Sequence, residues 1–264
     1  MSEIRHFVHR PRTDLRPFVR EIIWVRSDEE RVQVLLPETA MTLVLRQSGD
    51  AWLNGQTLPG AMVSGLQERT RNVRHGGASS IIVVRFTEVG GPAILHDRVD
   101  LLFAKTTPLD AFISGDYIGR LQNHLADAPA IREQTAIVER FLGERIQPRN
   151  GATAQIAAAA GMIRASGGRA QVADIARRVA MSQSALERHF RAATGATPKM
   201  FSRLARLHEV CRLWDAGKNL TAIAYDAGYT DQPHMVRDFQ LFTGMSPQQF
   251  FRTNSPRNLP TFYK

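Results

Sequence analysis

Polar side chains that suit hydrogen bonding to nucleic-acid bases are spaced along two segments near the C-terminal end. At 100° per residue, Leu186 and Phe190 share one face of the first segment, and Met235 and Phe239 share one face of the second. The opposite faces carry Ser184, Glu187, Arg188 and Arg191 in the first segment and Gln232, Pro233, Val236, Arg237 and Gln240 in the second. Arginine can bond both acceptors of guanine, glutamine can pair with adenine, and valine can contact the thymine methyl group. We therefore predict that both faces read DNA, since a merely solvated face explains one segment more easily than two.

The charge distribution supports a polyanionic partner for the same region. Residues 150–264 hold 15 lysines and arginines but only seven aspartates and glutamates, a net charge of +8. Residues 1–149 have a net charge of +1, so almost the whole excess of +9 lies in the C-terminal part. Such asymmetry favours nucleic acid or an anionic membrane surface as partner.

An internal repeat covers both segments. The stretch from Val172 matches the stretch from Leu220 with an offset of 48 and, after one inserted residue, of 49. The pairs with identical residues include Ile175 and Ile223, Arg188 and Arg237, Phe190 and Phe239, Gly195 and Gly244, and Pro198 and Pro247.

Each copy has the pattern of a helix-turn-helix unit. We predict short first helices over 172–179 and 220–227, tight turns at Ala180 and Gly228, and helix caps at Ser182 and Thr230. The second helix of each unit should end at Gly195 or Gly244, with Pro198 and Pro247 at the start of the next helix. The predicted units span 172–194 and 220–243.

These segments resemble the AraC/XylS family of transcription regulators over residues of about 155–252. The resemblance is carried by ADIARRVAMSQSALERHF, FSRLARLHEVCRLW and LTAIAYDAGYTDQPHMVRDFQLFTGMSPQQFF. It implies two units joined by one long helix, with recognition helices about one helical turn apart on the duplex. It also implies base contacts from Ser184, Glu187, Arg188, Gln232, Pro233 and Arg237, with Gln183 and Arg191 nearer the phosphates. Pro233 departs from the small polar residue usual there, and Glu187 would bring a carboxylate close to phosphate.

The N-terminal part reads as short strands followed by two helices. Segments 21–26, 31–36, 41–46 and 79–86 are rich in β-branched residues, and helical spacing returns over 116–126 and 131–146. We predict an α+β protein, with a cupin-like all-β barrel and a helical layer before an all-α domain that holds two helix-turn-helix units. The domains should span 1–148 and 152–254, with a linker at 147–151.

The N-terminal part resembles the effector and oligomerisation domains of the same family, which implies an unknown small-molecule effector and a homodimer. Candidate effector contacts are Trp24 and Trp52 by stacking and Arg46 and Arg85 by charge, and each also suits a core or rim position. Double-stranded DNA is the predicted partner, with RNA polymerase as a further one. We expect no membrane partner, no cofactor and a cytoplasmic location.

Other chemistry finds little support in the residues. His6, His9, His75, His96 and His124 lack metal-ligand spacing, and no phosphate-binding loop or nucleophile motif occurs, so we predict neither a metal site nor an enzyme. Cys211 is the single cysteine and lies on an apolar helix face. Two alternatives stay open: an N-terminal domain that only dimerises or binds a protein, and a DNA-repair alkyltransferase acting through Cys211.

Overall fold

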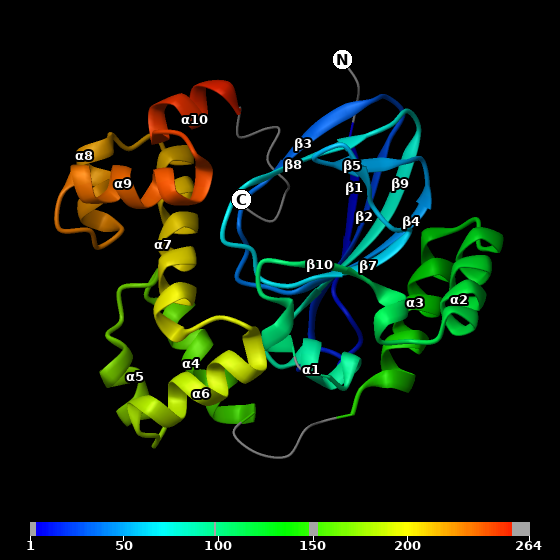
Figure 1. The fold of residues 1–264 in the computed structure, drawn as a ribbon, viewed down its shortest axis with the longest axis horizontal. Helices are drawn as coiled ribbons and strands as arrows, with labels where there is room; N and C mark the ends of the chain where they lie inside the picture. Colours follow the sequence, from blue (N-terminus) through cyan, green and yellow to red (C-terminus); the bar gives the residue numbers. More distant parts are fainter. Residues whose placement is uncertain (1–3, 98, 148–152, 255–264) are drawn as a thin grey trace.

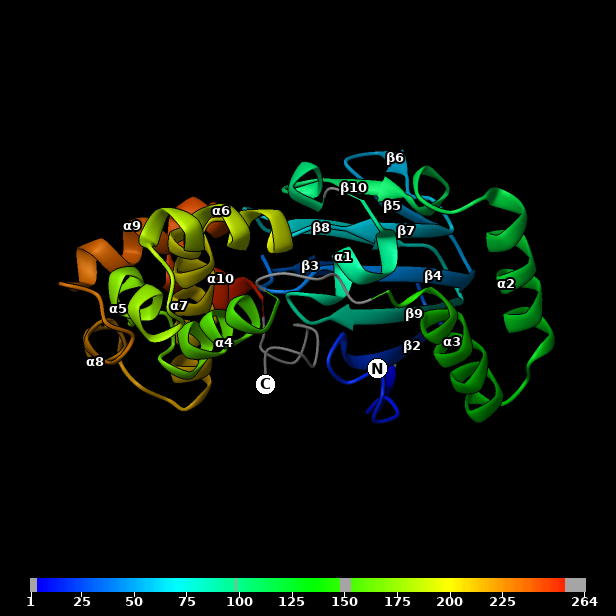
Figure 2. The same ribbon diagram turned by 90° about the horizontal axis from the view of Figure 1, so that it is seen from below.

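The computed structural model describes residues 4–97, 99–147 and 153–254. A β-rich N-terminal domain lies beside a helical C-terminal domain (Figures 1 and 2). This arrangement confirms the predicted α+β fold class. The predicted linker, apart from Gln147, lies outside the described residues, as do both limits of the boundary predicted at 148 and 152.

Two antiparallel sheets form the N-terminal domain. The larger sheet has the order β1-β2-β9-β4-β7-β10, and the smaller has the order β3-β8-β5-β6. Their strands are β1 Arg5–His9, β2 Val19–Ser27, β3 Arg31–Leu35, β4 Thr42–Ser48, β5 Ala51–Leu53, β6 Gln56–Thr57, β7 Ala61–Ser64, β8 Arg71–His75, β9 Ser79–Phe86 and β10 Thr106–Pro108. The four strands predicted from β-branched runs correspond to β2, β3, β4 and β9, and the shorter strands carry no such signal.

Alternating side chains divide the larger sheet into two apolar faces. In β2, Ile22 and Trp24 point toward the helical layer, whereas Ile23 and Val25 point toward the smaller sheet. Strand β9 alternates in the same way, with Ile82 on the helix side. Both faces are buried, so these strands read as continuous apolar runs.

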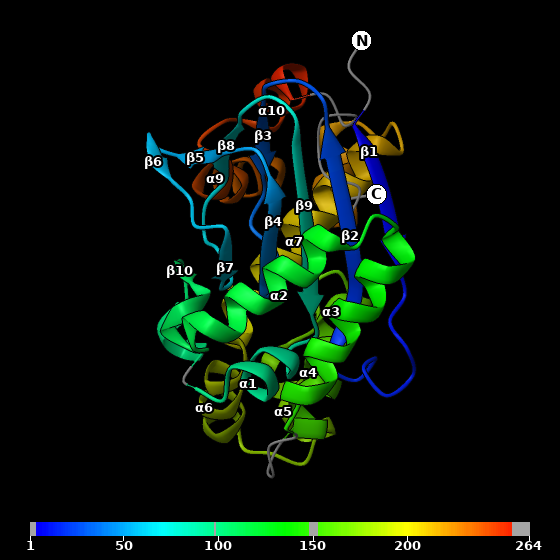
Figure 3. The same ribbon diagram turned by 90° about the vertical axis from the view of Figure 1, so that its right-hand side faces the viewer.

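Helices cover the outer face of the larger sheet (Figure 3). They are α1 Gly90–Leu95, α2 Gly115–Asp127 and α3 Ile131–Arg145, with short 3-10 turns η1 Val99–Leu102 and η2 Leu109–Ala111. The helices predicted over 116–126 and 131–146 are confirmed as α2 and α3. Ile118, Leu121 and Val138 of these helices share one buried cluster with the sheet, so the helical layer belongs to the N-terminal core.

The C-terminal domain contains helices throughout its described residues. They are α4 Thr153–Ala165, α5 Val172–Arg178, α6 Gln183–Thr194, α7 Pro198–Asp215, α8 Leu220–Asp226, α9 Gln232–Thr243 and α10 Pro247–Thr253. The long helix α7 runs between two groups, with α4, α5 and α6 at one end and α8, α9 and α10 at the other (Figure 1). The two predicted helix pairs are therefore α5 with α6 and α8 with α9.

The predicted turns and caps are confirmed except at one position. Ala180 and Gly228 both take positive φ, of 54° and 78°, where the chain reverses between the paired helices. Ser182 caps α6, because its side chain accepts from the Ala185 amide. The cap predicted at Thr230 is wrong: Asp231 has extended backbone and accepts from the His234 amide at 2.6 Å, so α9 begins one residue later than a threonine cap requires.

Candidate DNA interface and ligand cavity

Helix α6 presents the polar face that the sequence predicts. Gln183, Ser184, Glu187, Arg188 and Arg191 are all exposed, while Leu186 and Phe190 are buried beneath them. Gln183 Nε2 donates to Glu187 Oε1 at 3.2 Å, so the carboxylate has a neutral partner on its own helix. Because Ser182 caps this helix, the exposed face begins at a helix N-terminus, where amide groups favour phosphate.

Helix α9 presents a less polar face. Pro233, Arg237 and Gln240 are exposed, whereas Gln232 and Val236 are half-buried. Gln232 Oε1 accepts from Thr221 Oγ1 at 3.0 Å, which ties its side chain to α8. Val236 packs against the helical core. Among the predicted contact residues of α9, Arg237 and Gln240 are therefore the polar groups most accessible to DNA.

A buried ion pair fixes α9 to the long helix. The Asp238 side chain is 7% exposed, and its Oδ1 accepts from Arg203 Nε at 2.9 Å and Nη2 at 2.6 Å. Its Oδ2 accepts from the Tyr229 hydroxyl at 3.1 Å, and burial raises the pKa of Tyr229, which keeps that hydroxyl protonated. Helical spacing does not predict this role of Asp238, because an acidic residue in an amphipathic helix is normally assigned to the solvent side.

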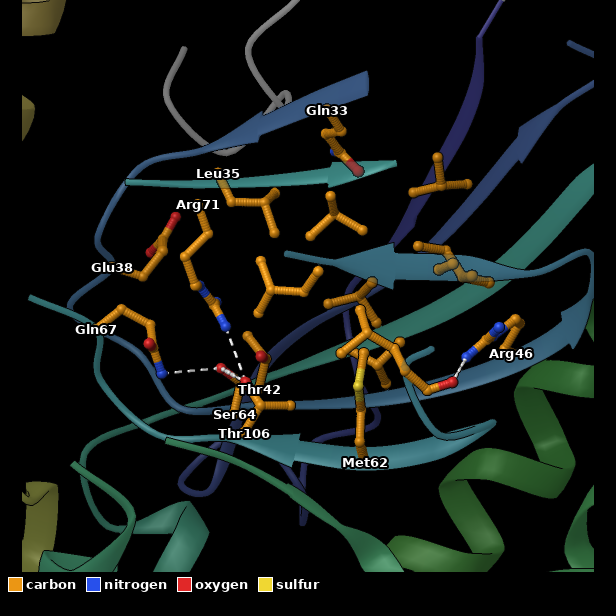
Figure 4. Close-up of a pocket in the computed structure, with 18 of the residues that line it drawn as sticks. Gln33, Leu35, Glu38, Thr42, Arg46, Met62, Ser64, Gln67, Arg71 and Thr106 are labelled. Carbon is orange, nitrogen blue, oxygen red and sulfur yellow. Dashed lines mark hydrogen bonds between the residues drawn. The ribbon is translucent and has the colours of Figure 1, made fainter. Parts of the chain in front are cut away.

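A cavity of about 110 Å³ lies between the two sheets of the N-terminal domain (Figure 4). Of the four residues predicted to meet an effector, Arg46 and Arg85 line it. Arg46 lies at one end, and Arg71 and Gln67 lie toward the other. The remaining lining is mostly aliphatic and includes Val25, Leu35, Val44, Ala51, Leu53, Leu58, Met62, Val73, Ile81 and Val83.

The two predicted tryptophan contacts lie outside this cavity. Trp24 is directed to the opposite face of β2, where it is buried and its Nε1 donates to Gln134 Oε1 at 3.0 Å. Trp52 alternates with Ala51 and Leu53, which line the cavity, and the guanidinium of Arg74 lies 4.2 Å from its ring. The sequence gives no means of telling these two faces apart, since both are buried or covered.

The charged groups of the cavity differ in how they are compensated. Arg85 forms ion pairs with Glu21 and with Glu38, the latter at 2.8 Å. Arg46 is 9% exposed and donates to the carbonyl oxygens of Leu58 and Pro59. Burial, together with the charges of Arg31 and Arg46, lowers the pKa of His75 to about 4. This end of the cavity is therefore positively charged beside a neutral imidazole.

Comparison with known proteins assigns the helical region. Residues 175–253 match the family model described as a helix-turn-helix domain. They form an AraC-type helix-turn-helix domain. Domains of this kind belong to DNA-binding transcription regulators. No curated protein matches this sequence.

Solved structures with similar folds are distant in sequence. ToxT from Vibrio cholerae is 12% identical, with a TM-score of 0.46, and the match covers 94% of this chain and 98% of that one. The ToxT structure described as bound to unsaturated fatty acid is 12% identical, with a TM-score of 0.46 over 95% and 96% of the two chains. The AraC-like transcriptional activator CuxR is 15% identical, with a TM-score of 0.30 over 80% and 86%.

Two loops of the N-terminal domain touch both the cavity and the AraC-type domain. We call residues 36–41, between β3 and β4, and residues 65–70, between β7 and β8, the interface loops. Leu36 and Leu66 are buried within the core cluster of the AraC-type domain. His208 of α7 donates to the Pro37 carbonyl oxygen at 2.6 Å, and the Thr70 amide donates to the Phe242 carbonyl oxygen of α9 at 2.8 Å.

The same loops supply part of the cavity wall. Leu36, Glu38 and Ala40 of the first loop and Gly65 and Gln67 of the second line the cavity. Gln67 Nε2 donates to the carbonyl oxygens of Gly65 and Lys105. The bond to Lys105 holds the second loop against the segment that precedes β10. A molecule that fills the cavity therefore contacts chain segments that pack directly on α7 and α9.

A buried carboxylate also joins the AraC-type domain to the N-terminal domain. Glu88, with a side chain 3% exposed, accepts hydrogen bonds from Arg20 of the N-terminal domain and from Arg164 of α4. Burial lowers the pKa of both arginines to about 10. Nearby, α6 packs on η1, where Gly195 lies close to the Val99 carbonyl oxygen.

Cys211, the candidate residue for alkyl transfer, lies in an unfavourable position for that reaction. Cys211 is 2% exposed on α7, and burial raises the pKa of its thiol, which suppresses the thiolate needed for alkyl transfer. In the part of the chain that the structure describes, no group of three histidine, cysteine or acidic side chains is arranged to hold a metal. The helices of that same part are too short or too polar to cross a membrane.

Proposed function

We propose that the protein is a sequence-specific DNA-binding transcription regulator whose DNA binding responds to a small molecule in the N-terminal cavity. The observation that carries this proposal is the double role of the interface loops. Their side chains line the cavity, and their residues contact α7 and α9 of the AraC-type domain. A ligand that moves these loops changes how the helix-turn-helix units are held. Homodimerisation and contact with RNA polymerase remain predictions.

Two arginines are proposed as the main base-reading groups. Arg188 of α6 and Arg237 of α9 occupy the same position of the repeat, are both exposed, and lie on faces opposite the buried Phe190 and Phe239. A guanidinium that bonds O6 and N7 of guanine contributes about 1–3 kcal/mol of discrimination. Arg191 and Gln183 are proposed to contact phosphate, Ser184 and Glu187 to contact bases, and Gln240 to add a polar contact from α9.

The experiment starts from DNA sites selected from a random library with the full-length protein. Replacing Arg188 or Arg237 by alanine should weaken binding to a selected site by about 1–3 kcal/mol and relax base preference at one position of its half-site. Fluorescence anisotropy at a fixed salt concentration measures the affinity, and a second selection with each variant measures the preference.

Arg140→Ala provides the matched control, because Arg140 is an exposed arginine of α3 in the N-terminal domain. It removes the same charge without touching either recognition helix, so it should leave base preference unchanged. If all three variants lost the same affinity for the selected DNA site, the loss would reflect net charge alone. That result would refute the assignment of α6 and α9 as recognition helices.

A further inference from the structure

The interior of the N-terminal domain contains a charge that the protein does not fully balance. Arg46 lines the cavity with a side chain 9% exposed, and its hydrogen bonds go to carbonyl oxygens of Leu58, Pro59 and Gly49. Carbonyl oxygens satisfy N–H groups but carry no net charge. Within the described residues, the carboxylate that approaches Arg46 is Asp50, at 3.9 Å, and its side chain is 70% exposed.

Arg85, in the same cavity, has its charge balanced by carboxylates. It lies between Glu21 and Glu38, both more than two-thirds buried. A buried cation without a close counter-ion is unfavourable, so the two arginines differ strongly in their capacity for an incoming anion. Of these two arginines, Arg46 is the one without a close carboxylate.

His75 lines the same cavity as Arg46, whose charge acts on its ring, and adds a second polar group. Its Nε2 lies 3.1 Å from Gln33 Oε1, and it pairs in register with Arg31 on β3 and with Ala51 on β5. The charged groups around this ring are Arg31 and Arg46, together with Asp50 beside Arg46. The surroundings therefore favour a neutral imidazole until an anion arrives.

The rest of the lining selects for an apolar body. Aliphatic side chains from both sheets make up most of the wall, and the described lining residues include no phenylalanine, tyrosine or tryptophan. A sugar would lose hydrogen bonds to water on every hydroxyl, and the described lining offers no aromatic ring for it to stack on. A cavity of about 150 Å³ holds benzene, so the smaller 110 Å³ here limits the ligand body to a short aliphatic chain.

We infer that this cavity binds a small monocarboxylic acid, with its carboxylate on Arg46 beside His75 and its apolar body between the two sheets. The inference rests on the proposed function, since it names the chemical class of the effector. It adds that Arg46, and not the paired Arg85, selects for the acid.

The test compares hexanoate with hexanamide, which has the same shape without the charge. Isothermal titration calorimetry on the full-length protein should show hexanoate binding at least ten-fold more tightly than the amide, and glucose should not bind. Arg46→Met should weaken hexanoate at least ten-fold and leave the amide unchanged. Arg74→Met is the control, because Arg74 lies on β8 beside His75 but stacks over Trp52 outside the cavity.

A second measurement needs no variant. Carboxylate beside His75 favours its charged form, so hexanoate should raise the His75 pKa from about 4, as followed by NMR of the ring in the wild-type protein. Equal affinity for acid and amide, an unchanged His75 titration, or an equal loss in Arg74→Met would each overturn the inference.

The same ligands separate this inference from the proposed function. If hexanoate binds as described but leaves affinity for the selected DNA site unchanged, the site stands and the effector role fails. If hexanoate does not bind while an unrelated compound alters DNA affinity, the effector role stands and the ligand class fails.

Discussion

At the scale of single residues, Asp238 shows how helix α9 is fixed to the rest of its domain. Its carboxylate meets both the guanidinium of Arg203 and the hydroxyl of Tyr229. The pair joins α9 to α7, while Arg237, its neighbour in sequence, is exposed on the outer face. The same turn of α9 thus carries Asp238, which positions the helix, and Arg237, which is proposed to contact DNA bases.

Replacing Asp238 by alanine should destabilise the protein by about 3–5 kcal/mol, because Arg203 would lose its carboxylate in a largely buried position. Urea unfolding followed by circular dichroism measures the change. Asp174→Ala is the control, since Asp174 pairs with Arg177 in an exposed position of α5 and should cost less than about 1 kcal/mol. Similar costs for the two variants would contradict the positioning role of Asp238.

Residue types predicted exposed positions better than buried ones. The polar faces of α6 and α9 follow from helical spacing alone, and most of their predicted residues are exposed. Asp238 could not be predicted, because its burial depends on Arg203, which is 35 residues away in sequence. Whether Trp24 and Arg46 line the cavity depends on which face of their strands is turned toward the smaller sheet. The sequence of a strand that is buried on both faces does not indicate this.

At the scale of elements, the two helix-turn-helix units use the same left-handed turn with different residues. Ala180 takes this conformation with a side chain, and Gly228 takes it without one. A non-glycine residue there costs about 1–2 kcal/mol, so the first unit is strained where the second is not. The turn was predictable because both residues are small and both stand between two helical patterns.

Exchanging the two residue types should therefore have unequal effects. Ala180→Gly relieves strain but increases the entropy of the unfolded chain, so its net effect on stability should stay within about 1 kcal/mol. Gly228→Ala should destabilise by about 1–3 kcal/mol, because the added Cβ would be strained at a φ of 78° and would lie 2.5 Å from Arg169 Cγ. Thermal unfolding of both variants provides the measurement, and a neutral Gly228→Ala would show that the turn relaxes freely.

At the scale of the whole molecule, the two domains share an interface that includes a buried carboxylate. Glu88 accepts from an arginine of each domain and is almost fully buried. Composition and charge predicted two domains of different character, but nothing in the pattern around Glu88 indicates a contact with Arg164, which lies 76 residues away.

Glu88→Gln should loosen this interface without unfolding either core. Loss of about 3 kcal/mol from a buried ion pair would increase hydrogen exchange of α4 amides by about 100-fold, while amides in the middle of α7 keep their protection. Hydrogen exchange with mass spectrometry resolves the two regions. Glu30→Gln serves as the control, since its pair with Arg74 is exposed and should leave both regions unchanged.

The interface loops have a consequence for any attempt to exchange domains between regulators. Leu36 and Leu66 belong to the N-terminal domain in sequence, but their side chains are part of the apolar core of the C-terminal domain. A chimera joined near residue 150 would transplant the helical domain without these two side chains and leave a void among its helices. The boundary that is natural along the chain is thus not a boundary of packing, and a transplant that works should carry both loops with it.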